Sequence, residues 1–277
     1  MRTALIQMCS SDDPTENAGV MREAIRQASA EGAGFILTPE VCNCLSPSRK
    51  HQHAVLRVEA EDPTLPQMQE EAARAGIWLL LGSLALKSGD PDGRFVNRSF
   101  LIDPTGSIVA RYDKIHMFDV ELGDGESYRE SSGYRPGDRA VTYQTSFGKI
   151  GLSICYDLRF PQLFRALAKS GAEIITVPAA FSPTTGVAHW MPLLTARAIE
   201  NGVFILAPAQ FGEHKTQIGS SRRTYGHSCA ISPWGELLAQ ASDKFSINYL
   251  FIDVQLSATA RMKIPSLSHE RFFEGPL

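Results

Sequence analysis

Short apolar runs of strand length alternate with helical patterns along most of this 277-residue chain, and this alternation constrains the fold more than any other feature. Strands are predicted at residues 3–8, 34–38, 77–84, 150–154, 174–177 and 203–207, and helices at 17–30, 66–75, 161–169 and 190–201. Helices interleaved with buried strands and hairpins predict a layered α/β protein with mixed sheets.

Two predicted hairpins share one kind of turn. Asp103-Pro104-Thr105-Gly106 joins one pair of strands, and Ser232-Pro233-Trp234-Gly235 joins another. The repeated turn suggests that the chain consists of two related halves. No linker-like segment separates them, so we expect one domain over residues 1–277. The segment after Ser257 is polar and contains proline, and we expect it to pack against a neighbour.

Composition and charge argue against several classes of partner. The net charge of −3 is spread without blocks of like charge, which argues against nucleic acid and anionic membranes. The apolar run at 3–9 is too short for a signal peptide, and prolines interrupt the longest uncharged stretch, 174–196, so we expect no membrane helix. The five cysteines lack the spacing of a disulfide framework, which predicts reduced thiols in the cytoplasm.

A carboxylate, an ammonium group and a thiol each follow directly after a predicted strand. They belong to Glu40, Lys114 and Cys155. Strand ends are where α/β proteins assemble sites from residues distant in sequence. Taken singly, each residue has a structural interpretation: a solvated loop carboxylate, a lysine at a strand edge and an inert core thiol. Together they are the groups that amide hydrolysis requires.

The chemistry assigns each group a role. A free thiol has a pKa of about 8.5, so it needs a base or a nearby cation to react at neutral pH. Glu40 is the candidate general base, and Lys114 the candidate cation that opposes the charge of a tetrahedral intermediate. Cys155 precedes a turn that leads into a helix, a placement typical of a nucleophile. The backbone N–H of Tyr156 in that turn is a candidate oxyanion donor.

Motifs for metals and cofactors are absent from the sequence. The seven histidines form no His-Glu-x-x-His pattern, and Cys42-Asn-Cys44 has the wrong spacing for a zinc or redox pair. No Gly-x-Gly-x-x-Gly or phosphate loop occurs. We therefore expect neither a metal nor a cofactor, and structural roles for His116 and His227.

Three segments resemble the nitrilase-like carbon–nitrogen hydrolase superfamily, whose catalytic set is Glu, Lys and Cys. They are Thr38-Pro39-Glu40, the stretch from Asp113 to Asp119, and the stretch from Gly151 to Pro161, in the family's order and spacing. The resemblance covers essentially the whole chain. It implies a four-layer α-β-β-α sandwich with two mixed sheets and a homodimer. It also implies a second glutamate, Glu130, that orients Lys114 or assists the leaving group; the alternative is a loop carboxylate.

Further similarity points to the branch that acts on ω-amides of keto acids and on deaminated glutathione. The similarity lies in residues 180–190 and 223–228. Tyr225 is the residue that resembles the deaminated-glutathione amidases, because ω-amidases tend to carry Trp at this position. The implied reaction converts a small carboxamide to carboxylate and ammonia through a thioester on Cys155. Alternatives are an ω-amidase for 2-oxoglutaramate-like amides, an aliphatic amidase or carbamoylase, and an inactive scaffold or binding protein.

Four residues are predicted to contact the substrate. The Arg159 guanidinium is expected either to bind a substrate carboxylate through two parallel hydrogen bonds or to form a structural ion pair, for example with Asp157. Phe181, Thr185 and Tyr225 are candidates to line the pocket, with core packing as the alternative for Phe181.

Overall fold

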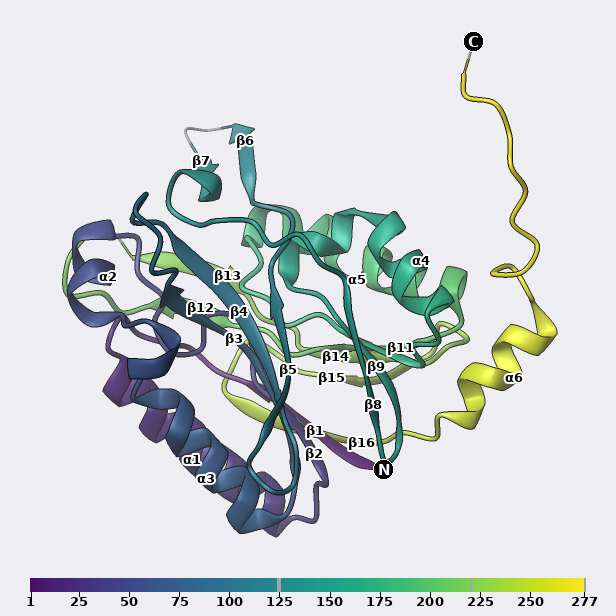
Figure 1. The fold of residues 1–277 in the computed structure, drawn as a ribbon, viewed down its shortest axis with the longest axis horizontal. Helices are drawn as coiled ribbons and strands as arrows, with labels where there is room; N and C mark the ends of the chain where they lie inside the picture. Colours follow the sequence, from purple (N-terminus) through teal and green to yellow (C-terminus); the bar gives the residue numbers. More distant parts are fainter. Residues whose placement is uncertain (124–125, 220, 277) are drawn as a thin grey trace.

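The computed structural model describes residues 1–123, 126–219 and 221–276, and it consists of two six-stranded mixed sheets with helices on their outer faces (Figure 1). The first sheet has the order β16-β1-β2-β3-β4-β5, and the second has the order β15-β14-β11-β10-β9-β8. Helices α1 and α3 cover the first sheet, and α4 and α5 cover the second. The predicted four-layer α-β-β-α architecture is confirmed.

The bounds of the elements are as follows. The first sheet contains β1 (Arg2–Gln7), β2 (Phe35–Leu37), β3 (Trp78–Lys87), β4 (Phe95–Ile102), β5 (Ile108–Asp113) and β16 (Ser246–Phe251). The second contains β8 (Val141–Thr145), β9 (Gly148–Leu152), β10 (Ile174–Thr176), β11 (Phe204–Ala207), β14 (Cys229–Ile231) and β15 (Leu237–Gln240). Two small hairpins pair β6 (Asp119–Gly123) with β7 (Glu126–Arg129), and β12 (Phe211–His214) with β13 (Arg222–Tyr225). The helices are α1 (Pro14–Ala30), α2 (Arg49–Val55), α3 (Thr64–Ala75), α4 (Pro161–Lys169), α5 (Pro183–Asn201) and α6 (Gln255–Lys263).

The two sheets are built in the same way. In the first, α1 and α3 connect the parallel strands β1, β2 and β3, and the antiparallel hairpin β4–β5 follows. In the second, α4 and α5 connect the parallel strands β9, β10 and β11, and the hairpin β14–β15 follows. Each sheet also has an antiparallel strand, β16 or β8, beside its first parallel strand. This correspondence confirms the two related halves predicted from the shared hairpin turn.

Side chains that point alternately to the two faces of each buried strand explain why the sheets are covered on both sides. In β2, Phe35 and Leu37 face the core between the sheets, whereas Ile36 faces the core shared with Met21 of α1 and Met68 of α3. Successive side chains of a strand point to opposite faces, so a wholly apolar strand requires cover on both sides. The first sheet obtains that cover from the second sheet and from the two helices.

The bounds of most predicted elements differ from the structure by a few residues, and the differences are largest at α5 and α6. Helix α5 begins at Pro183 instead of Trp190, because proline suits the first turn and Gly186 allows the helix to lie against Tyr225. A Cβ on Gly186 would lie 2.3 Å from Cγ of Tyr225. The segment predicted as a polar tail after Ser257 belongs in part to α6. Ser266 and Glu270 then contact Arg165 and Lys169 of α4, and the last residues lead away from the body (Figure 1). None of the helices in the described part of the chain is both long and apolar enough to cross a membrane.

Candidate active site

The loop after β2 places Glu40 by packing tightly against β3. Thr38 Oγ1 accepts a hydrogen bond from Gly82 N at 3.0 Å, and Ser83 Oγ accepts one from Val41 N at 2.8 Å. Val41 has a φ of +44°, a strained value for a β-branched residue. A Cβ on Gly82 would lie 2.0 Å from the Thr38 carbonyl oxygen, so only glycine permits this approach. Glu40 is therefore held rigidly just beyond the strand.

Cys155 occupies a strained turn between β9 and α4. Its φ is +47°, and its N–H donates to the Pro178 carbonyl at 2.9 Å. The turn is a short 3-10 helix, η3 (Cys155–Arg159), and the Asp157 carboxylate accepts a hydrogen bond from Ile154 N at 2.8 Å. Such strain persists only where surrounding contacts over-determine it. The thiol is 8 % exposed.

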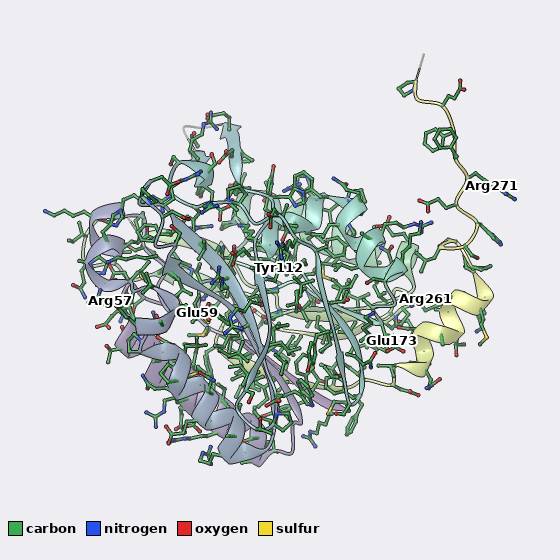
Figure 2. All side chains as sticks on the ribbon, in the orientation of Figure 1. Arg57, Glu59, Tyr112, Glu173, Arg261 and Arg271 are labelled. Carbon is green, nitrogen blue, oxygen red and sulfur yellow. The ribbon has the colours of Figure 1, made fainter. Side chains whose placement is uncertain are left out.

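Asp157 also links this turn to the segment that carries Lys114. Its carboxylate accepts hydrogen bonds from the Tyr112 hydroxyl at 2.6 Å and from His116 N at 3.0 Å, and it lies 2.7 Å from His116 Nδ1. Tyr112 lies at the centre of the molecule, between the sheets (Figure 2). Asp157 thus has Tyr112, His116 and the turn itself as partners. The alternative in which Arg159 pairs with Asp157 is wrong, because the carboxylate is fully buried among these donors.

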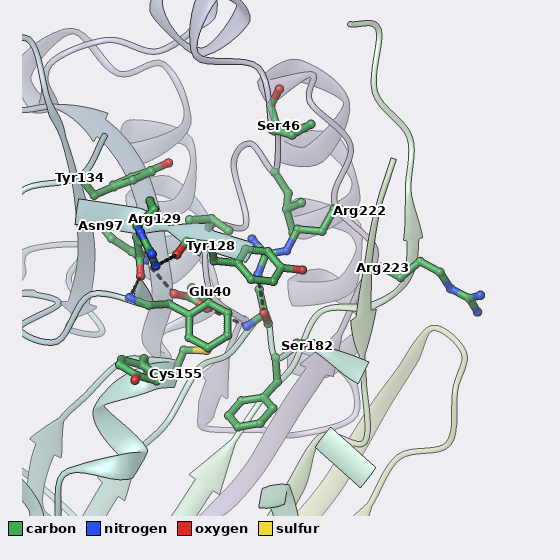
Figure 3. Close-up of a pocket in the computed structure, with 18 of the residues that line it drawn as sticks. Glu40, Ser46, Asn97, Tyr128, Arg129, Tyr134, Cys155, Ser182, Arg222 and Arg223 are labelled. Atoms are coloured by element: carbon green, nitrogen blue, oxygen red, sulfur yellow. Dashed lines mark hydrogen bonds between the residues drawn. The ribbon is translucent and has the colours of Figure 1, made fainter. Parts of the chain in front are cut away.

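Lys114 bridges two carboxylates beside the thiol. Its Nζ lies 2.9 Å from Glu40 Oε1 and 2.9 Å from each oxygen of Glu130. Glu40 also accepts hydrogen bonds from Asn97 Nδ2 at 2.8 Å and from Ala180 N at 2.7 Å. The structure therefore brings together Glu40, Lys114, Glu130 and Cys155 on one cavity lining (Figure 3).

The electrostatics of the cluster favour a neutral thiol beside a carboxylate. Burial and the negative charge of Glu40 raise the pKa of Cys155 well above its ordinary value, although Lys114 acts to lower it. Burial alone would raise the pKa of Glu40, but Lys114 and the hydrogen bond from Cys155 lower it below its usual range. Burial opposes the ammonium form of Lys114, yet Glu130 and Glu40 raise its pKa well above normal. A base-assisted thiol fits this arrangement better than a preformed thiolate.

The cluster lines a cavity of about 700 Å³. Other predicted residues on its lining are Tyr156, Phe181 and Thr185. Residues on the lining that were not predicted include Arg49, Asn97, Phe118, Tyr128, Tyr134 and Arg222 (Figure 3). A cavity of this size accommodates a molecule considerably larger than a simple aliphatic amide.

Two predicted binding residues, Arg159 and Tyr225, are not among the residues that line the cavity. The Arg159 guanidinium lies over the rings of Tyr156 and Phe181, at 5.8 and 5.6 Å from their centroids, and 3.2 Å from His189 Nδ1. Tyr225 packs against Gly186 and donates its backbone N–H to the Phe181 carbonyl. Substrate contact by Arg159 and Tyr225 stays a prediction.

The unpredicted neighbours of the cluster differ in how visible they are in the sequence. Asn97 is a fully buried polar residue within the apolar strand β4, and such a residue signals a specific hydrogen-bond partner. Ala180 acts through its backbone N–H, which no side-chain pattern reveals. Within the described ranges, no group of three His, Cys, Asp or Glu side chains is arranged to hold a metal ion.

A buried thiol, a carboxylate base and an ammonium group on one cavity define a thiol-dependent hydrolase site. The family model of carbon-nitrogen hydrolases matches residues 2–264. The deaminated glutathione amidase of Yersinia enterocolitica is 40 % identical over 97 % of this chain and 92 % of its own length. Saccharomyces cerevisiae Nit3, a member of branch 10 of the nitrilase superfamily, is 28 % identical with a TM-score of 0.84, over 98 % of this chain and 97 % of that one.

The chain belongs to the carbon–nitrogen hydrolase family. It is an amidohydrolase, acting on carbon–nitrogen bonds other than peptide bonds. An amidase from Nesterenkonia sp. is also similar, at 25 % identity and a TM-score of 0.77, over 96 % of this chain and 98 % of that one; its structure shows acrylamide added to the active-site cysteine.

Proposed function

We propose that this protein hydrolyses the amide of deaminated glutathione, with Cys155 as nucleophile. The observation that carries the proposal is that Cys155 lines the same cavity of about 700 Å³ as the hydrogen-bonded pair of Glu40 and Lys114. The names of several relatives support the substrate. Deaminated glutathione is a 2-oxo acid joined by an amide to cysteinylglycine, so hydrolysis releases that dipeptide as the amine. A primary amide in the same site releases ammonia.

In the first half of the reaction, the Cys155 sulfur attacks the amide carbonyl while Glu40 accepts the thiol proton. The negative charge that develops on the carbonyl oxygen is stabilised by Lys114 Nζ and the backbone N–H of Tyr156. Glu40 then transfers the proton to the departing nitrogen, the carbon–nitrogen bond breaks, and a thioester remains. The contacts of Glu40 with Asn97 and Ala180 hold the carboxylate in place for both transfers.

In the second half, Glu40 accepts a proton from water, which attacks the thioester. The carbon–sulfur bond breaks, and the proton returns to Cys155. Glu130 accepts two hydrogen bonds from Lys114 and one from Phe118 N at 2.6 Å. It is therefore a positioning residue that holds the ammonium group.

A substrate panel tests the proposal. Purified protein should hydrolyse deaminated glutathione with a kcat/KM at least about tenfold higher than 2-oxoglutaramate or simple aliphatic amides, because only the larger substrate fills the cavity. Release of cysteinylglycine and of ammonia measures the rates. A preference for 2-oxoglutaramate would support the ω-amidase alternative. Absence of hydrolysis across the panel would support a binding or scaffold role.

The pH dependence should distinguish attack assisted by Glu40 from attack by a thiolate that forms without a base, at the ordinary thiol pKa. Because the pKa of Glu40 is lowered and that of Cys155 is raised, the reactive pair of carboxylate and thiol should persist across neutral pH. We expect kcat/KM to be flat from about pH 6 to 8 and to fall in acid as Glu40 becomes protonated, below about pH 4.3. A thiolate-dependent rate would instead rise about tenfold per pH unit towards pH 8.5.

We also propose a cytoplasmic homodimer. The cysteines at 9, 42, 44, 155 and 229 are free thiols, in keeping with a reducing compartment. Large apolar side chains are exposed on α5 and α6 and on the extended tail, among them Val187, Met262 and Phe272, and a second subunit would cover them. Sedimentation velocity should give about twice the chain mass of 30.4 kDa, and a monomer at micromolar concentration would contradict the dimer.

A further inference from the structure

Three arginines on the cavity lining, Arg49, Arg222 and Arg223, form no salt bridge with a described residue, and of these Arg49 and Arg222 are half-buried whereas Arg223 is exposed. The cavity carboxylates, Glu40 and Glu130, are both bound to Lys114. Arg49 and Arg222 line the same cavity without a salt bridge to a described Asp or Glu, although the charge of Arg222 helps to lower the pKa of Glu40. A guanidinium partly removed from water is most stable when an anion accepts its hydrogen bonds. An anion supplied by the substrate would complete both sites.

Arg222 is the better placed of the two. It is half-buried at the start of β13, and its Nη2 donates to the Ala180 carbonyl at 2.9 Å. Its guanidinium carbon lies 5.6 Å from the centroid of the Tyr128 ring, which supports its flat face (Figure 3). The buried Nε of Arg222 has no hydrogen-bond partner in the described structure. Part of its planar donor edge is thus unused.

Arg49 is held in a similar way on the lining. Its guanidinium carbon lies 4.9 Å from the centroid of the Tyr134 ring, and Nη1 donates to Gln52 Oε1 at 2.9 Å. A Cβ on Gly133 would lie 1.9 Å from the guanidinium carbon, so glycine there makes room for the arginine. Stacking on an aromatic face orients a guanidinium and leaves its in-plane N–H groups for other partners.

We propose that Arg222 binds a carboxylate of the substrate, with Arg49 adding positive charge to the same cavity, so that the enzyme selects anionic amides. This inference rests on the proposed amidase function of the Cys155 cluster. It assigns the carboxylate contact to Arg222, which lines the cavity, whereas Arg159 does not line it and lies over the rings of Tyr156 and Phe181.

The distance between Arg222 and the reacting groups defines the substrate class. Both Arg222 and Glu40 are hydrogen-bonded to Ala180, one to its carbonyl and the other to its N–H. The guanidinium and the base are therefore at most about 9 Å apart. A carboxylate four to six bonds from the scissile carbonyl spans about 5–8 Å. Deaminated glutathione has one carboxylate in this range on each side of its amide.

Kinetics on matched substrates test the assignment. The substrates are deaminated glutathione and two analogues, each with one carboxylate replaced by a carboxamide, and cysteinylglycine or its amide is the measured product. Arg222→Gln should lower kcat/KM on deaminated glutathione about 10- to 100-fold, because it removes a charged hydrogen-bonded contact. For the analogue that lacks the bound carboxylate, the same substitution should change kcat/KM less than about threefold. Arg222→Lys, which keeps the charge without the fork, should fall between.

Arg223→Gln is the matched control. It removes the same charge from the next residue of β13, which borders the rim of the cavity, but its side chain extends away from it (Figure 3). Its kcat/KM on deaminated glutathione should stay within about twofold of wild type. If Arg222→Gln instead lowers kcat/KM equally for all three substrates, the residue acts only by supporting Ala180, and the inference is overturned while the amidase function stands.

A binding measurement separates this inference from turnover. Cys155→Ala protein should bind deaminated glutathione in calorimetric titration, and the Cys155→Ala/Arg222→Gln variant should bind it about 10- to 100-fold more weakly. Equal affinity of the two variants, or the absence of binding to both, would overturn the carboxylate assignment even if wild-type protein proves to be an amidase for other substrates.

Discussion

Cys155→Ala is expected to abolish turnover and to leave the fold intact. The substitution removes the only atom that can form the proposed thioester, and loss of a nucleophile typically lowers kcat by about 10⁴-fold or more. Alanine keeps the Cβ of the strained turn, and the Asp157 contacts that hold the turn remain. Product release should therefore be lost while the thermal unfolding midpoint changes little.

Cys9→Ser provides the control for this experiment. Cys9 is an exposed cysteine that does not line the cavity, and its thiol is hydrogen-bonded to the Glu213 carbonyl. The variant should keep full activity and remain sensitive to iodoacetamide. Inactivation of the wild type should follow modification of Cys155 one for one, as measured by peptide mass spectrometry. Turnover by Cys155→Ala at the wild-type rate would rule out the covalent mechanism.

Lys114→Ala is expected to damage both activity and stability. The ammonium group is 3 % exposed and bound to Glu40 and Glu130, so its removal leaves two buried carboxylates without their cation. Removing one partner of a buried ion pair typically costs about 3–5 kcal/mol in unfolding free energy. The oxyanion also loses a donor, which typically lowers kcat by about 10²–10³-fold. Urea denaturation and steady-state kinetics measure the two effects.

The stability loss of Lys114→Ala should depend on pH in a defined direction. In the wild type, the lowered pKa of Glu40 contributes stability that is present above its unfolded pKa and is lost in acid. Without Lys114, burial raises the pKa of that carboxyl above its unfolded value. The variant should therefore be most destabilised at neutral and alkaline pH, and the difference from wild type should shrink as the pH falls.

A surface ion pair supplies the comparison. Arg94→Ala breaks the pair with Asp92, which is largely exposed to solvent, and should leave the unfolding midpoint and its pH dependence close to wild type. If the unfolding midpoint of Lys114→Ala also stays close to wild type at all pH values, Lys114 does not stabilise the buried carboxylates of Glu40 and Glu130.

The reacting residues were predictable because each follows a strand that the apolar pattern identifies. Glu40, Lys114 and Cys155 all lie one to three residues beyond β2, β5 and β9. Arg222 was not predictable as a lining residue, because β13 is a short strand in a two-stranded hairpin with few apolar residues. Its position depends on contacts with Ala180 and Tyr128, which are distant in sequence.

The fold was predictable where elements are buried on both faces, as in β2 and β3. The small hairpins β6–β7 and β12–β13 were not, since their short, largely polar strands lack the alternation that marks a half-buried strand. The sequence pattern predicted the start of α5 at Trp190, seven residues too late. Pro183 and Gly186 favour a loop locally, whereas packing against Tyr225 stabilises the helix.

The correspondence of the two sheets has a consequence for how activity is distributed along the chain. Glu40 and Lys114 come from the first sheet, and Cys155 comes from the second. A chain divided between β7 and β8 would yield two fragments, neither with a working centre, and the first sheet would regain its edge strand β16 only from the second fragment. Turnover would then appear only when the fragments reassociate, so catalysis would serve as a direct reporter of complementation.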